Sequence, residues 1–317
     1  MVAELGQRLT VGAEAATHFA ASPGCTVVNG IVGSAGLPAS LAALEAGNRL
    51  ALANQESLVS GGELVIAALE RGGGELIPVD SEHSAVEQCL RGEERGSVRR
   101  LILSASGGPF RGLGADALAA ATPEEALQHP TWDMGDRITI DSATLMNKAF
   151  EVIEAHFLFG IDYDDIAVVV HPQSIVHSLV EFVDGSLKAQ LGEPDMRVPI
   201  RYAITHPHRE ASEAVDGFRL AGVTLQFEDP DPVAFPCLRL GYEAGRMGGS
   251  APAVLNAADE IAVQAFLERR IGFASIAEVV ERTMGAVPHR SIRSVDEVLE
   301  VDREARAVAH EQIGGSC

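Results

Sequence analysis

The chain has 317 residues, 46% of them hydrophobic, and a formal net charge of −21, which predicts two or three domains with buried cores. The negative charge argues against binding to nucleic acid or to an anionic membrane surface, and no apolar run approaches the roughly 18 residues of a membrane span. The four cysteines are widely spaced without a C-x-x-C pair, which favours a reduced chain in the cytoplasm.

The first 80 residues alternate helical and strand patterns. The start, Met1-Val-Ala-Glu-Leu, is interpreted as a helix. Residues 30–47 predict a turn and a helix, 50–53 a strand, 60–71 a helix stopped by three glycines, and 76–79 a strand leading to Asp80. Alternation of this kind indicates a parallel sheet.

The rest of the chain predicts two further parts and a linker. Residues 81–207 predict a helix at 84–90, a strand at 101–103, a loop at 123–137 and one helix at 142–159. Strands at 166–170 and 178–183 and an Asp184-Gly185 hairpin turn follow, giving a mixed sheet that could support contact between subunits. Residues 208–236 predict an irregular linker, and 237–317 a helical bundle. On its longest helix, Asn256, Asp259 and Glu260 are expected on a solvated or capping face.

Acidic residues and a lysine suggest a metal site. Asp80-Ser81-Glu82 follows a predicted strand, and in an extended segment its two acids point to the same side. Asn147, Lys148 and Glu151 share one face of a predicted helix. If these faces meet, three carboxylates provide the oxygen ligands that suit Mg²⁺ or Mn²⁺. Each segment alone is equally consistent with a solvated strand end or helix face.

Hydroxyl groups and a glycine-rich turn suggest a phosphate site. Ser104-Ala-Ser106-Gly107-Gly108 follows an apolar strand and offers hydroxyls and backbone N–H groups to an anion. Asp141-Ser142 is predicted to open a helix, whose N-terminus would attract phosphate. The alternative is an ordinary turn and an ordinary cap. The side chains that could hold one phosphate together are Ser106, Ser142, Asn147 and Lys148.

The predicted loop at 123–137 contains the only tryptophan of the chain. It includes His129-Pro-Thr-Trp132-Asp-Met134-Gly135. A large aromatic side chain in such a loop either packs locally or covers a ligand, and loops that exclude water are common over active sites. The residues alone favour neither alternative. His171 and His177, further along, are expected to be structural because no acidic partner stands beside them.

Seven segments resemble the motifs of one enzyme family, in that family's order. They are residues 52–58, 78–83, 106–111, 129–135, 141–148, 171–177 and 252–258. On these motifs the chain resembles 1-deoxy-D-xylulose 5-phosphate reductoisomerases from about Val28 to near the C-terminus. The resemblance implies an α/β fold: a partial Rossmann-like NADPH-binding domain (1–80), a catalytic and dimerisation domain (81–207) with a lid loop (123–137), a linker and the bundle.

The resemblance also assigns roles to residues. The implied metal ligands, for Mg²⁺ or Mn²⁺, are Asp80, Glu82 and Glu151. The implied substrate-binding residues are Ser81, Glu82, Ser106, His129, Ser142, Asn147, Lys148 and Glu151, with Trp132 and Met134 as the lid. The implied catalytic residues among them are Glu82, His129, Lys148 and Glu151. The implied cofactor contacts are Asn54, Glu56 and Gly135.

The sequence departs from the family's pattern in two places. The family begins with a strand, a glycine-rich turn and a helix that bind a dinucleotide pyrophosphate, whereas this chain starts in what corresponds to a later helix. The run from Gly30 to Gly36 is interpreted as a second such turn, not as the pyrophosphate site. The family motif A-N-K-E-S has Gln55 in place of lysine, and an amide carries no charge.

The resemblance implies a homodimeric cytoplasmic enzyme that acts on a sugar phosphate, without nucleic acid or membrane as partner. It would rearrange 1-deoxy-D-xylulose 5-phosphate and reduce the product with NADPH to 2-C-methyl-D-erythritol 4-phosphate, in the non-mevalonate isoprenoid pathway. The alternative is a truncated, non-catalytic homologue that binds metal and sugar phosphate without turnover. Gln55 and the missing start favour the alternative, and the intact acids and Lys148 favour the enzyme.

Overall fold

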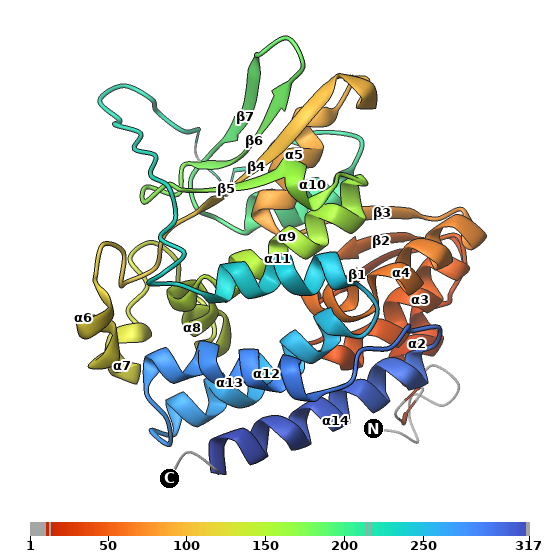
Figure 1. The fold of residues 1–317 in the computed structure, drawn as a ribbon. Helices are drawn as coiled ribbons and strands as arrows, with labels where there is room; N and C mark the ends of the chain where they lie inside the picture. The colour runs from red at the N-terminus through yellow and green to blue at the C-terminus, as the bar shows by residue number, and fades with distance from the viewer. Residues whose placement is uncertain (1–10, 13, 214, 216, 315–317) are drawn as a thin grey trace.

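The structure, a computed structural model, describes residues 11, 12, 14–213, 215 and 217–314. The helix expected at Met1-Val-Ala-Glu-Leu lies outside these residues. Figure 1 shows two sheets, one on each side of a central helix, above a layer of C-terminal helices. The expected α/β class is therefore confirmed.

The first sheet is parallel, as predicted, with strand order β1-β2-β3. Its strands are β1 (Thr26–Asn29), β2 (Arg49–Leu52) and β3 (Glu75–Pro78). The helices of this part are α2 (Ala15–Ala20), α3 (Leu37–Glu45) and α4 (Gln55–Gly72), and a 3₁₀ turn, η2 (Ser34–Gly36), precedes α3. The α4 helix begins earlier than predicted because the Asn54 side chain accepts the Ser57 N–H as an N-cap. It ends at Gly72 and is followed by the C-cap Gly73, which has a φ of 67°.

The second sheet is mixed and has the order β5-β4-β6-β7. The strands β4 (Val98–Ala105) and β5 (Ile166–Val170) are parallel, whereas β6 (Val176–Phe182) and β7 (Leu187–Leu191) extend the sheet antiparallel. Shorter elements flank these strands: η3 (Arg95–Ser97), α6 (Ala115–Ala119), α7 (Pro123–Ala126), η4 (Tyr163–Asp165) and α10 (Arg197–Thr205).

The helix α5 (Ser81–Leu90) begins earlier than predicted. Asp80 is its N-cap and accepts the Glu82 N–H at 3.0 Å, so the motif is a helix start and the extended geometry expected for it is wrong. The two acids still face one site, because a cap residue and the second helical residue flank the same helix end.

The single helix predicted at 142–159 is two helices. These are α8 (Asp136–Thr144) and α9 (Met146–Phe159), separated by Leu145 with a left-handed φ of 61°. Asp141 and Ser142 therefore lie in the last turns of α8, and the expected helix N-terminus at this point does not exist. A leucine rarely adopts this conformation, so the local residue preferences give no sign of the break.

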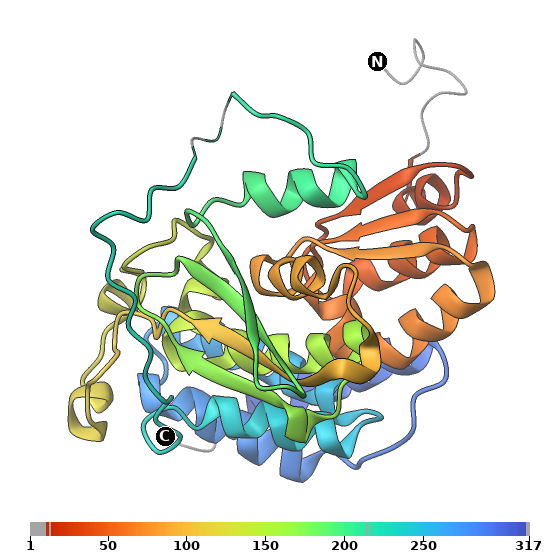
Figure 2. The same cartoon turned by 90° about the horizontal axis from the view of Figure 1, so that it is seen from above.

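Four C-terminal helices form the predicted bundle: α11 (Cys237–Met247), α12 (Ala251–Leu267), α13 (Phe273–Ala286) and α14 (Val295–Gly314). The segment between α10 and α11 is irregular, as expected, and runs around the outside of the molecule (Figure 2). The α11 helix packs closely on α9, since a methyl group added at Gly241 would overlap Ala149. The central core extends from α9 into this bundle and includes the buried Phe150 and Phe266.

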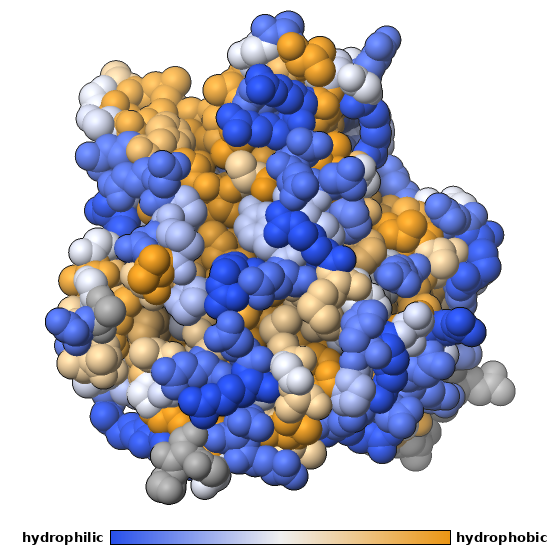
Figure 3. All heavy atoms as spheres, in the orientation of Figure 1, coloured by the Kyte–Doolittle hydropathy of each residue, from blue (hydrophilic) through white to orange (hydrophobic). Residues whose placement is uncertain are grey.

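The outer surface is mainly hydrophilic in the view of Figure 3, with apolar patches. One patch lies at the tip of the hairpin that joins β6 and β7, where Val183 is 67% exposed. Among the described residues, none of the helices combines the length and apolarity needed to cross a bilayer.

Candidate active site

A cavity of about 250 Å³ lies where the two sheets meet the α8–α9 pair. Its walls come from the segments that follow β2, β3 and β4, from the loop before α8, and from the segment between β5 and β6. In both sheets these are carboxyl ends of parallel strands, the usual location of ligand sites in α/β proteins. The predicted residues that line it are Asp80, Ser81, Glu82, Ser106, His129, Trp132, Met134, Ser142, Asn147, Lys148 and Glu151.

Three carboxylates converge on one side of the cavity. One oxygen each from Asp80, Glu82 and Glu151 lies within 4.8 Å of the others, so the two segments do meet, which was the condition for a metal site here. Asp80 and Glu82 stand at the start of α5, and Glu151 is presented by α9. Lys148 Nζ lies 3.2 Å from Glu82 Oε1 and forms an ion pair with Glu151.

The cluster carries more negative charge than its lysine can balance. Burial and the neighbouring Glu82 raise the pKa of Glu151 well above its usual value. Burial alone would lower the pKa of Lys148, but Glu151, Glu82 and Asp80 outweigh it and hold the amine protonated. A divalent cation would relieve this repulsion, and the all-oxygen donor set fits Mg²⁺ or Mn²⁺.

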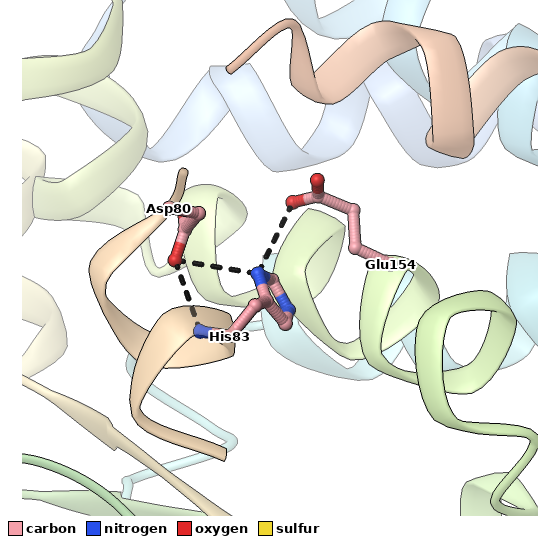
Figure 4. A group of neighbouring side chains, drawn as sticks. All are labelled: Asp80, His83 and Glu154. Carbon is pink, nitrogen blue, oxygen red and sulfur yellow. Dashed lines mark hydrogen bonds and ion pairs between the residues drawn. The ribbon is translucent and has the colours of Figure 1, made fainter. Parts of the chain in front are cut away.

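Behind the cluster, His83 joins the two helices that carry the carboxylates (Figure 4). Its Nδ1 lies 3.3 Å from Asp80 Oδ1 and 3.9 Å from Glu154 Oε2, and its Nε2 donates to the Glu151 backbone carbonyl at 2.8 Å. Burial opposes its charge, but Asp80 and Glu154 raise the pKa of His83 to about 10. His83 thus fixes the ligand-bearing ends of α5 and α9, a role that sequence reasoning missed.

Gln55 stands where the resemblance implies a lysine. Its Nε2 donates to Glu154 Oε2 at 2.9 Å and lies 3.5 Å from Asn147 Oδ1. Asn147 in turn donates to Glu151 Oε1 at 2.6 Å. The Gln55 amide therefore bonds to the polar groups of this wall without supplying a charge. Burial raises the pKa of its partner Glu154 to about 8.

Ser106 and His129 form a second polar group in the cavity. The backbone N–H groups of Thr131 and Trp132 donate to His129 Nδ1, at 3.2 and 2.9 Å. This leaves the proton of the neutral ring on Nε2, which lies 2.9 Å from Ser106 Oγ. Burial lowers the pKa of His129, so the ring stays neutral and can donate to an anion together with the serine hydroxyl.

The loop before α8 supplies one wall of the cavity. Trp132 and Met134 line it, and the Trp132 ring centroid lies 6.3 Å from that of His177. His177 and Ser174 also line the cavity, although His177 was expected to be structural. Ser174 has a left-handed φ of 49°, which no sequence pattern indicates.

The three expected cofactor contacts lie outside the cavity lining. Asn54 is buried, with its side chain bonded to Ser57, Gly33 and Glu56. Glu56 accepts a hydrogen bond from Arg137 at 2.9 Å. Gly135 is the N-cap of α8. The solvated face expected for α12 is wrong: Asn256 and Asp259 are fully buried, and Glu260 is 18% exposed in an ion pair with Arg137.

Comparison with known proteins gives consistent matches along the chain. A family model of 1-deoxy-D-xylulose 5-phosphate reductoisomerase matches residues 1–62, one of its C-terminal domain matches 76–159, and one of the DXP reductoisomerase C-terminal domain matches 191–308. A reductoisomerase from Xanthomonas oryzae pv. oryzae is 54% identical over 306 residues, covering 96% of this chain and 77% of that protein. One from Bacillus cereus is 49% identical over 308 residues, covering 96% and 81%.

Solved structures give the same result. The Zymomonas mobilis reductoisomerase in complex with NADPH matches with a TM-score of 0.90 and 45% identity, covering 95% of this chain and 78% of that one. A DOX-P reductoisomerase in complex with NADPH, fosmidomycin and magnesium matches with a TM-score of 0.90 and 40% identity, covering 99% and 82%. Identity at this level, over more than three quarters of each relative, settles the family. The chain belongs to the 1-deoxy-D-xylulose 5-phosphate reductoisomerases.

Proposed function

We propose that this chain converts 1-deoxy-D-xylulose 5-phosphate to 2-C-methyl-D-erythritol 4-phosphate by rearrangement and NADPH-dependent reduction, in the non-mevalonate isoprenoid pathway. The observation that carries the proposal is that one cavity gathers every residue proposed to bind metal or substrate. The free state of the three described cysteines, Cys25, Cys89 and Cys237, supports a cytoplasmic location.

We assign the metal to Asp80, Glu82 and Glu151. When bound there, Mg²⁺ or Mn²⁺ would act as a Lewis acid on adjacent carbonyl and hydroxyl oxygens of the substrate. Lys148, already charged and 3.2 Å from Glu82, would donate to a substrate oxygen as negative charge develops on it. His83 would fix the distance between the ligands, because it contacts both of the helices that carry them, α5 and α9.

We assign the phosphate and hydroxyl groups of the substrate to the polar groups opposite the carboxylates. Ser106 Oγ and His129 Nε2 lie 2.9 Å apart and can point at one anionic group. Ser81, Ser142 and Asn147 offer further donors along the cavity wall. Binding energy from the remote phosphate would orient the reacting carbons at the metal side.

The loop at 123–137 is proposed as a lid. Trp132 and Met134 would cover the substrate and keep the aldehyde formed by rearrangement away from water until it is reduced. Asn54, Glu56 and Gly135 would lie at the side from which the nicotinamide approaches. We place the domain limits at residues 80, 207 and 236. The cofactor-binding part, the catalytic part and the bundle would then all border the place where the nicotinamide approaches.

The test of this function is NADPH oxidation, followed by absorbance, with 1-deoxy-D-xylulose 5-phosphate and Mn²⁺. We expect consumption that requires both substrate and metal. No consumption, with substrate still binding in a calorimeter, would support the alternative: a non-catalytic homologue with Gln55 in place of the family's lysine. Absence of both substrate binding and turnover would contradict the proposed activity and the non-catalytic alternative alike.

A homodimer is proposed on the basis of the exposed edge of the mixed sheet. Strand β7 pairs only with β6 among the described strands, and apolar side chains lie along this side of the molecule. An edge strand with apolar neighbours is suited to contact with a second copy. The exposed apolar side chains at this edge are Val183 in the hairpin turn and Leu187 and Leu191 on β7 itself.

Replacement of Leu187 by aspartate is expected to shift the protein from dimer to monomer, because it buries a charge at the proposed interface. Leu187 is 55% exposed in the single chain, so folding should be unaffected. Analytical ultracentrifugation would measure the change. Val233, which is 85% exposed on another segment, provides the control Val233→Asp. A wild-type chain that sediments as a monomer would refute the proposal.

A further inference from the structure

Arg137 lies at a junction of three separate parts of the chain. It stands in the first turn of α8 and is the last residue of the proposed lid (123–137), with a side chain 25% exposed. Its Nη1 lies 2.9 Å from Glu56 Oε1 at the start of α4 and 2.9 Å from Glu260 Oε1 on α12. Its Nη2 donates to Asn256 Oδ1, also on α12, at 2.8 Å. One guanidinium thus joins three helices that are distant in sequence.

The contact with Glu56 continues to the glycine-rich turn. The other oxygen of Glu56 accepts from Asn54 Nδ2 at 2.6 Å, and the same amide lies 3.1 Å from the Gly33 carbonyl. Asn54 Oδ1 also accepts the Ser57 N–H and so starts α4. A Cβ at Gly36 would overlap the Asn54 side chain, which shows how closely the turn packs against it. A continuous series of bonds therefore runs from α8 to the turn.

The opposite side of Arg137 is anchored in the bundle. Asn256 is fully buried, and Glu260 is held by a second arginine, Arg306 of α14, which also pairs with Asp302. Asp259 and Asp141 complete the acidic surroundings, at 3.6 and 3.5 Å from the guanidinium. The α12 side of the Arg137 guanidinium is therefore fixed by buried and ion-paired partners. Because these partners fix the orientation of the guanidinium, its hydrogen bond to Glu56 has a defined direction.

We propose that Arg137 is a positioning residue for the dinucleotide side of the site, holding the Gly30–Gly36 turn and the start of α4 in register with the end of the lid. This rests on the proposed function, because it assigns the cofactor to that side. Asn54 and Glu56 direct their side chains at protein partners. Their contribution to dinucleotide binding would be the backbone conformation of the Gly30–Gly36 turn and of the start of α4. Arg137, at the end of the proposed lid, would fix that conformation.

The test compares the wild type with Arg137→Gln, Arg137→Lys and the control Arg306→Gln. The control removes the other arginine bonded to Glu260 but makes no contact with Glu56. Hydrogen exchange of peptides covering 30–36 and 54–57 reports the turn without any ligand. Fluorescence titration with NADPH reports the cofactor side, and calorimetry with Mn²⁺ alone reports the carboxylate cluster.

For Arg137→Gln we expect faster exchange in both peptides and an NADPH Kd raised about tenfold or more, as for loss of a hydrogen bond to a charged group. The Mn²⁺ affinity should change less than about twofold, since the cluster is built on α5 and α9. Arg137→Lys keeps the charge but cannot bond two helices in fixed geometry, so its values should fall between those of the wild type and Arg137→Gln. It also serves as the deciding variant if the glutamine variant fails to fold.

Unchanged exchange in the two peptides, or an equal change in Arg306→Gln, would overturn the proposal. A wild type that binds no NADPH would instead refute the proposed function, and the exchange data would still decide the role of Arg137. Equal loss of NADPH and Mn²⁺ binding in Arg137→Gln would mean general loosening of the fold and would also overturn it.

Discussion

Replacing Glu151 with glutamine is expected to weaken Mn²⁺ binding by about 100-fold or more and to reduce NADPH oxidation in proportion. The substitution removes one of three charged oxygen ligands and leaves the shape of the side chain unchanged. It also removes one of the two carboxylate partners of Lys148, so the lysine charge would face the metal position less fully balanced. Isothermal calorimetry with Mn²⁺ alone measures the effect directly.

The matched control is Glu154→Gln, one turn further along α9. Glu154 is buried like Glu151 but belongs to a different acidic group, with Asp80 and His83. Its substitution should reduce Mn²⁺ affinity by much less, because it reaches the ligands only indirectly, through His83 and through Gln55 and Asn147. Strong loss in Glu154→Gln with normal binding in Glu151→Gln would place the metal in the other group and contradict our assignment.

Replacing Lys148 with methionine is expected to destabilise the metal-free protein by about 3–5 kcal/mol, because it leaves buried carboxylates without their cation. The Lys148 side chain is 5% exposed and contacts Glu82 and Glu151. Substrate binding should be lost as well. Saturating Mn²⁺ should recover more stability in the variant than in the wild type, since the ion replaces the missing charge.

Urea unfolding with and without Mn²⁺ would measure these free energies. The chain contains one other lysine, Lys188, which is 42% exposed in an ion pair with Glu93. Lys188→Met should change the free energy of unfolding by less than about 1 kcal/mol. A Lys148→Met variant as stable as this control, with or without metal, would show that the cluster is not electrostatically strained.

The sequence patterns predict most of the fold because apolar periodicity and glycine stops are local signals. The parallel sheet, the hairpin at Asp184-Gly185 and the four bundle helices follow from them. The shared face of Asn147, Lys148 and Glu151 was also predicted, since their spacing on one helical turn survives the errors in helix boundaries, whereas the meeting of this face with Asp80 and Glu82 depends on the tertiary fold. A periodic face keeps its residues together wherever the helix begins.

The errors have a common physical origin in contacts between distant residues. Leu145 adopts a left-handed conformation because tertiary packing fixes it, and this moves Asp141 from a helix start to a helix end. Asp259 looks like a surface acid, but it is buried beside Arg137, which is far from it along the chain. His83 joins two helices through contacts that no short motif contains. Long-range partners of this kind cannot be read from local spacing.

The close contact between Gly241 and Ala149 has a consequence for motion in this enzyme. Because a single methyl group at Gly241 would overlap its neighbour, α9 and α11 are in close contact here, and close packing of this kind resists a shift of one helix against the other. The helix that carries Asn147, Lys148 and Glu151 is then the stationary half of the site. We therefore expect any opening and closing of the site to involve the loop at 123–137, which we propose as its lid, and not a shift of α9.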